Sequence, residues 1–102
     1  MKHYIIVKFN ENVDKEKLIN PIKELFQKAM DIKGVEKIYI YESNMDLPNR
    51  YDLMIKMNLS QTALKEFDSS EIHKKWKEEF GKNIMSKAIF DCEWTNKKFK
   101  FY

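Results

Sequence analysis

The chain has 102 residues, of which 43% are hydrophobic and 14% aromatic, so it is long enough for one domain and too apolar to be disordered. No apolar run approaches the ~20 residues of a membrane span, the start lacks the features of a signal peptide, and Cys92 is the only cysteine, so we expect a cytoplasmic protein with no membrane partner. The net charge of +3 comes entirely from the last six residues, and this absence of a basic excess elsewhere argues against a nucleic-acid partner.

Residues 3–9 form the first predicted element. Positions with apolar side chains alternate there with positions that carry either polar or apolar ones, which is the pattern of a half-buried β-strand. The more apolar face carries His3, Ile5, Val7 and Phe9. A histidine on such a face is either a polar group in a pocket or a satisfied core residue, and the sequence leaves both interpretations open.

Residues 14–33 repeat apolar side chains at helical spacing, and Asp14 is the expected N-cap. Pro21 predicts one of two disturbances: a kink at this point, or a second helix start that Asn20 caps. Gly34 should end the helix, because glycine adopts positive φ readily.

Two further strands are predicted next, at residues 35–42 and 51–59, and a loop separates them. The apolar face of the second of these strands carries Tyr51, Leu53, Ile55, Met57 and Leu59.

Two helices and a last strand complete the predicted domain. Ser60 can cap a short helix, and Asp68 with Glu71 resembles a capping box for the next one. That second helix should bury Trp76 and end at Gly81, before a strand at residues 87–94. We therefore divide the chain into a domain at residues 1–94 and a basic, aromatic tail at residues 95–102. The tail is either a short extra strand, for which the partner subunit is one place to lie, or a frayed end.

The order strand, helix, strand, strand, helix, strand predicts an α+β fold of the ferredoxin-like βαββαβ type. Its four-stranded antiparallel sheet should carry both helices on the face that includes His3 and Leu53. The opposite face still shows Tyr4, Ile6 and Met54, which are large apolar groups to leave in water. We therefore expect a homodimer joined sheet to sheet.

Four segments of the sequence carry a family resemblance in combination. They are KHYIIVKF at residues 2–9, RYDL at residues 50–53, the stretch from Phe67 to His73, and the pair Phe90-Asp91. In this order and at this spacing they resemble the stress-responsive α/β-barrel (Dabb) domain family, which belongs to the dimeric α/β-barrel superfamily.

The resemblance implies a ligand pocket between the sheet and the helices of each subunit. In the plant polyketide cyclases of this family, the histidine of the second helix is a general base and the first-strand histidine shares its pocket. The matching residues here are His73 and His3. Phe67 and Leu25 stand where the cyclases have tyrosines that bind ketone oxygens. The residues expected to line the pocket are Ile5, Val7, Leu25, Tyr51, Leu53, Ile55, Phe67 and Trp76, although for Trp76 a place in the core is the favoured interpretation.

Three functions follow from these observations. The first is a dimer that binds a small hydrophobic ligand. The second is an enzyme that uses His73 as a base and His3 as its partner, either a polyketide-cyclase-like lyase or a cofactor-free monooxygenase. The third is a structural or stress-related interaction protein with a filled core. No third ligand accompanies the two histidines at metal-binding spacing, and we expect neither a metal nor a cofactor.

Overall fold

The computed structural model describes residues 1–93, which contain a four-stranded antiparallel sheet. The strands are β1 (Lys2–Phe9), β2 (Val35–Glu42), β3 (Leu53–Leu59) and β4 (Ile84–Cys92). Their order across the sheet is β2-β3-β1-β4, so the first strand of the chain is central and the last lies at an edge. This is the predicted ferredoxin-like arrangement.

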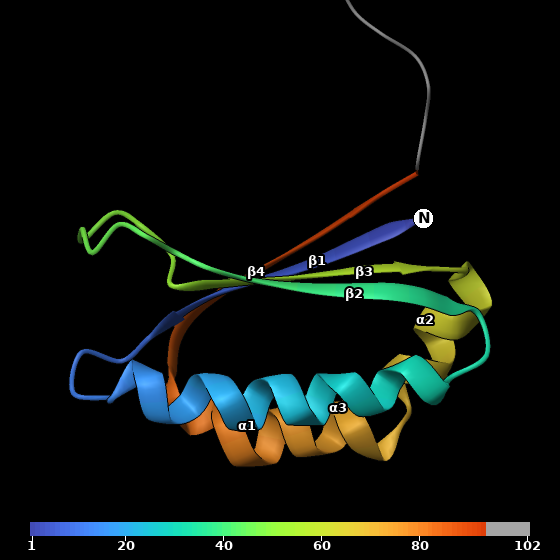
Figure 1. Ribbon diagram of the computed structural model, residues 1–102, viewed down its shortest axis with the longest axis horizontal. Helices are drawn as coiled ribbons and strands as arrows, with labels where there is room; N and C mark the ends of the chain where they lie inside the picture. The colour runs from blue at the N-terminus through green and yellow to red at the C-terminus, as the bar shows by residue number, and fades with distance from the viewer. Residues whose placement is uncertain (94–102) are drawn as a thin grey trace, which may run out of the picture.

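Among residues 1–93, all the helices lie on one face of this sheet and none covers the other face (Figure 1). Helix α1 (Lys15–Gln27) continues into a short 3₁₀ helix, η1 (Lys28–Asp31). After β3 come α2 (Gln61–Asp68), α3 (Glu71–Lys75), a π-helical turn η2 (Trp76–Phe80) and a 3₁₀ turn η3 (Gly81–Asn83). Among residues 1–93, no helix is long and apolar enough to cross a membrane.

Buried and half-buried side chains alternate strictly along β1 and β3, and the buried ones form the sheet side of the core. Every second residue of both strands points toward the helices and is buried, from His3 to Phe9 and from Leu53 to Leu59. Three aromatic rings from the helices meet this surface: Phe26, Phe67 and Trp76, each buried. The predicted helix-facing side of the sheet is therefore confirmed.

Helix α1 contradicts one of the two alternatives that Pro21 suggested, the second helix start at Asn20. The helix runs unbroken from Lys15 to Gln27, and Asn20 starts no new helix. Pro21 is exposed, so its ring meets solvent and the backbone hydrogen bond that it cannot make is lost at the surface. Asp14 occupies the N-cap position, but its side chain makes no capping bond.

The third strand begins at Leu53, so the prediction that it starts at Tyr51 is wrong. The preceding residue explains this: the carboxylate of Asp52 accepts the Phe9 N–H at 2.8 Å and the Lys15 ammonium at 2.8 Å. These two bonds fix Asp52 at the end of the sheet and tie it to α1, and Tyr51 lies beyond them, 40% exposed.

Serine caps explain the two short helices. The Ser60 Oγ accepts the Ala63 N–H at 3.1 Å, as predicted. The capping box expected at Asp68 is wrong, because Ser70 is the cap and its Oγ accepts the His73 N–H at 3.3 Å. The last strand covers Ile84–Cys92 instead of residues 87–94, and the predicted tail at residues 95–102 lies outside the described part of the chain.

Gly34 is required where η1 turns into β2. Its φ is +95°, and a Cβ built on it would lie 2.6 Å from the Ser60 Oγ. A Gly34→Ala change is therefore expected to cost about 2–4 kcal/mol, from left-handed strain and disturbance of the α2 cap. Urea denaturation measures this loss in the free energy of unfolding. Gly81→Ala is the control, since no atom lies within 4 Å of its added Cβ. Equal effects of the two changes would contradict the explanation.

Candidate functional site around two histidines

His3 is a polar side chain in an apolar core. It faces the helices from β1 and is 5% exposed. Its Nδ1 lies 2.5 Å from the Asp91 Oδ1, a short contact between an imidazole and a carboxylate. A buried polar group needs such a partner, because desolvation without a hydrogen bond is costly. The carboxylate also fixes the orientation of the ring and its tautomer.

Asp91 is a functional candidate to which the sequence analysis gave no role, although the pair Phe90-Asp91 is part of the family resemblance. It lies opposite His3 in the pairing of β1 with β4, so both side chains point to the helix-facing side. The Asp91 side chain is 44% exposed. The buried imidazole is thus connected to solvent through its carboxylate partner.

His73 comes from α3, one turn after the Ser70 cap. Its side chain is only 18% exposed, and its Nε2 lies 4.0 Å from the Asp68 Oδ1. Burial lowers the pKa of His73, the positive charge of Lys77 lowers it further, and Asp68 opposes the shift. The imidazole is therefore neutral at pH 7 and able to accept a proton.

Phe67 touches both histidines. Its ring centroid lies 6.5 Å from that of His3 and 5.3 Å from that of His73, with edge-on geometry in both contacts. The phenyl ring is fully buried. It thus brings the two predicted site histidines into one cluster, but it offers no hydroxyl group to a ligand.

The other predicted lining residues separate into two groups. Those that are buried in the hydrophobic core are Ile5, Val7, Leu25, Leu53, Ile55, Phe67 and Trp76. Trp76 stands edge-on to Phe26 at 5.1 Å. Tyr51 is the exception, because it is exposed and lines a surface hollow together with Tyr41 and Met54.

A surface hollow of about 240 Å³ lies beside His73. Its walls come from the segment that joins α2 to α3 and from η2, and they include Asp68, Ser70 and Lys77. His3 does not line this hollow. The structure therefore places His73 between the aromatic core and a depression with polar walls.

Stability should fall with decreasing pH because of His73. Its folded-state pKa lies below the usual ~6.5, so the unfolded chain takes up the proton first as the pH falls below ~6.5. We expect the free energy of unfolding to decrease from pH 7.5 to pH 5.5 more in the wild type than in His73→Gln, which cannot titrate. Urea denaturation at each pH measures the free energy of unfolding of both proteins. Parallel pH profiles of the wild type and His73→Gln would contradict the prediction.

The outer sheet face is defined here as the side of the sheet that points away from the helices. Across its centre, Tyr41, Met54, Ile6 and Ala88 form one cross-strand row, and Tyr39, Lys56, Tyr4 and Phe90 form the next. The Tyr39 and Tyr41 rings stack at 6.0 Å, and the Lys56 ammonium lies 4.9 Å from the Tyr39 centroid. This face is therefore apolar and aromatic at its centre.

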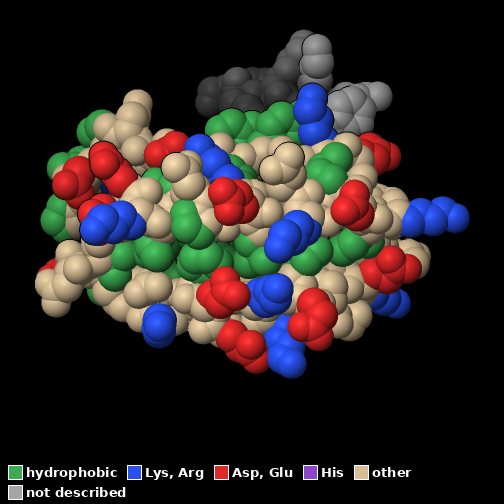
Figure 2. Space-filling view, turned by 60° about the horizontal axis from the view of Figure 1, so that its bottom comes forward, with side chains coloured by type: hydrophobic (Ala, Val, Ile, Leu, Met, Phe, Trp, Pro, Cys, Tyr) green, Lys and Arg blue, Asp and Glu red, His purple; other side chains and the backbone are tan. Residues whose placement is uncertain are grey.

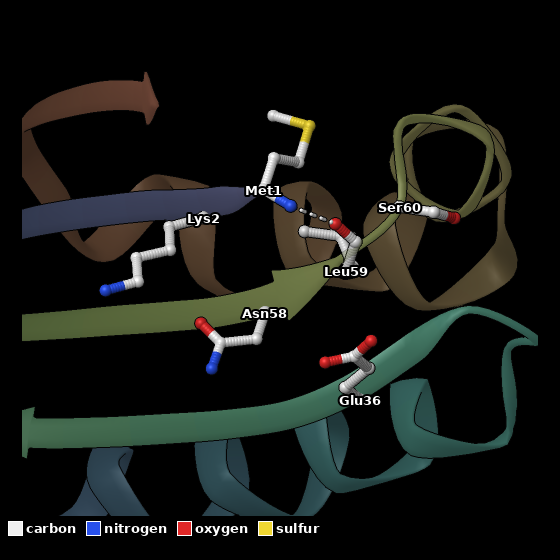
Figure 3. Close-up of a pocket in the computed structure, with 6 residues that line it drawn as sticks. All are labelled: Met1, Lys2, Glu36, Asn58, Leu59 and Ser60. Carbon is white, nitrogen blue, oxygen red and sulfur yellow. Dashed lines mark hydrogen bonds between the residues drawn. The ribbon is translucent and has the colours of Figure 1, made fainter. Parts of the chain in front are cut away.

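The polar end of the outer sheet face contains a hollow of about 520 Å³ (Figure 3). Figure 3 shows Lys2, Asn58 and Glu36 around it, contributed by three neighbouring strands, with the amino terminus bonded to the Leu59 carbonyl. The Asn58 Oδ1 is buried, and no hydrogen-bond donor reaches it within residues 1–93. The hollow is lined by neither histidine.

Charge is distributed evenly over the face that Figure 2 shows, where acidic and basic side chains are intermixed with hydrophobic ones. Within residues 1–93, no group of three His, Cys, Asp or Glu side chains is placed to hold a metal ion. The chemistry available around the histidines is therefore that of an imidazole, a carboxylate and apolar walls.

Comparison with known proteins identifies the fold. No family model matches the sequence, and no curated protein does. Among solved structures, a Dabb family protein with a ferredoxin-like fold from Mesorhizobium loti superposes with a TM-score of 0.70 at 11% identity, covering 93% of this chain and 96% of that chain. The fold expected from the resemblance to the Dabb family is thus confirmed.

Two other similar structures differ in what is known of them. A dimeric protein of unknown function with a ferredoxin-like fold, from Bacteroides fragilis, has a TM-score of 0.68 at 20% identity, covering 91% of this chain and 94% of that chain. The hydroxynitrile lyase from Passiflora edulis has a TM-score of 0.76 at 11% identity, covering 95% and 94%. The same fold therefore occurs in an enzyme and in a protein without a known role.

Proposed function

We propose that this chain is a cytoplasmic homodimer that binds a small hydrophobic ligand on the helix-facing side of its sheet, next to His3 and His73. The observation that carries the proposal is the His3–Asp91 pair, a polar group buried at 5% exposure in a core that is otherwise apolar. A domain that needed only stability would gain as much from an apolar residue at this position. Retaining the pair favours a role in recognition.

The helix-facing side of β4 offers access to this site. Ile89 lies next to Asp91 on that side and is 55% exposed, so the helices leave the strand uncovered there. Lys87, two positions further along, is close enough to His73 to lower its pKa. A ligand at this position would touch an apolar side chain and reach a carboxylate and two imidazoles.

The outer sheet face supports the homodimer. Its centre includes Phe90 at 60% and Tyr41 at 45% exposure, which one chain alone leaves in water. Each 100 Å² of apolar surface that a second copy covers contributes about 2.5 kcal/mol. Two of the proteins with the same fold are described as dimeric.

Catalysis is the second candidate function, and one feature favours it. A carboxylate that orients an imidazole is the usual arrangement behind a general base, and His73 is neutral and adjacent through Phe67. A lyase would use such a base to remove a proton from a bound hydroxyl or carbon atom. The third function, an interaction protein with a filled core, would need neither histidine.

Proton NMR of the two histidine rings tests the ligand site, with acetophenone as the probe. Ligand binding predicts saturable shifts of both ring signals in the wild type and their loss in Ile89→Lys. Leu47→Lys is the matched control, because Leu47 is also exposed but lies in the loop between β2 and β3. If neither ring signal shifts when acetophenone is added, the proposal is overturned, and the interaction protein with a filled core is the function that remains.

Turnover separates a lyase from a binding protein. Mandelonitrile is a suitable first substrate because its cleavage to benzaldehyde and cyanide is followed by absorbance. An enzyme that uses the histidine cluster should lose this activity in His73→Gln and retain it in Lys65→Gln, a control at an exposed position of α2. Probe binding without turnover of mandelonitrile or of a poly-β-ketone would favour the binding protein.

A further inference from the structure

Strand β4 is an edge strand with both faces uncovered. Among residues 1–93 it pairs only with β1, so its other edge has free backbone groups. Ile89 is 55% exposed on the helix-facing side, and Phe90 is 60% exposed on the outer sheet face. A long, apolar, exposed edge invites pairing with any other strand, and proteins usually cover it.

The end of the sequence has the pattern of a strand that could cover this edge. Residues 97–102 read Lys-Lys-Phe-Lys-Phe-Tyr, in which Phe99 and Phe101 alternate with lysines, and they lie outside the described part of the chain. Only residues 93–96 separate them from the end of β4, which is a usual length for a hairpin loop. We propose that residues 97–102 fold back on their own subunit as a fifth strand, antiparallel to β4.

The side chains select one register for this hairpin. With a four-residue loop, Lys97 lies opposite Cys92, Lys98 opposite Asp91 and Phe99 opposite Phe90. The two phenyl rings then meet on the outer sheet face, and the lysine meets the carboxylate on the helix-facing side. Cross-strand pairs of these kinds are each worth about 0.2–1 kcal/mol.

A shift by one residue destroys this match. Phe99 would then lie opposite Asp91, and Lys100 would lie opposite Phe90, so that every side chain of the segment changes face. Charge also favours the chosen register, because Lys98 then lies opposite Asp91, the one acid on the helix-facing side of β4. The fifth strand would place Lys98 beside the carboxylate that binds His3 and would extend the outer sheet face.

The only cysteine of the chain makes the register testable. In Lys97→Cys, the new thiol should face Cys92 across the hairpin, within reach of a disulfide. Oxidised glutathione removes two electrons and two protons from the two thiols. We expect a disulfide within one chain, seen as a loss of two hydrogen atoms by mass spectrometry and a single-chain band on a non-reducing gel.

Lys98→Cys is the matched control, because its thiol would point to the other face and should stay reduced under the same conditions. Three results would overturn the proposal. Disulfide-linked dimers of Lys97→Cys would place the segment on a second copy. Equal cross-linking in both variants would mean that no register is held. Absence of cross-linking, together with rapid hydrogen exchange at the β4 amides that do not bond to β1, would mean that the edge is free.

Discussion

Met54→Lys is expected to dissociate the proposed homodimer, of about twice 12.4 kDa, into monomers of 12.4 kDa. Met54 lies between Ile6 and Tyr41 in the apolar row at the centre of the outer sheet face. In a sheet-to-sheet dimer the new ammonium group would be buried without a partner. An unpaired buried charge costs about 3–5 kcal/mol, and a two-fold dimer would contain it twice. Sedimentation equilibrium at micromolar concentration measures the mass.

Met30→Lys is the control for this experiment. Met30 is 42% exposed in η1, on the helical side, so the same change of side chain should leave the dimer intact. A monomeric wild type would refute the dimer itself. A dimer that tolerates Met54→Lys would show that the two copies meet through another surface.

Trp76→Ala is expected to lower the free energy of unfolding by about 3–5 kcal/mol, a large part of the stability of a domain this small. The indole is 2% exposed and contacts Phe26 at 5.1 Å and Phe80 at 5.8 Å between ring centroids. Its removal deletes these contacts and leaves a cavity in the core. Urea denaturation of both proteins measures the difference.

Leu47→Ala provides the comparison, because Leu47 is also a large apolar residue but is 41% exposed in the loop between β2 and β3. It should cost less than about 1 kcal/mol. Similar small losses in both variants would mean that Trp76 is not packed as described and that the space around it is open to a ligand.

Local patterns were sufficient to predict the fold. The period of two in residues 3–9 and the β-branched run at residues 35–42 gave both strands, and Gly34 gave the turn between helix and strand. These features depend on neighbours in the sequence. One error arose where a distant residue decides the structure: Tyr51 is outside β3, and Asp52 beside it is bound by Phe9 and by Lys15.

The candidate site was only half predictable for the same reason. His3 and His73 stood out because they are the only two histidines, and burial of His73 lowers its pKa as a desolvated imidazole requires. Asp91 gave no comparable signal. It partners His3 only because β1 pairs with β4 in one register, and a sequence does not state which residues of two strands lie opposite each other.

The central position of β1 has a consequence for how the chain folds. The strand that is synthesised first has β3 and β4 as its neighbours, and the His3–Asp91 contact joins residues 88 positions apart. While the protein is being made, β1 can therefore pair along one edge only after β3 (Leu53–Leu59) and along the other edge only after β4 (Ile84–Cys92) has been synthesised. Such long-range pairing slows folding and leaves an apolar strand exposed on the nascent chain. Folding should thus be a late, concerted event. We expect chaperones to bind the growing chain while its apolar strand is exposed.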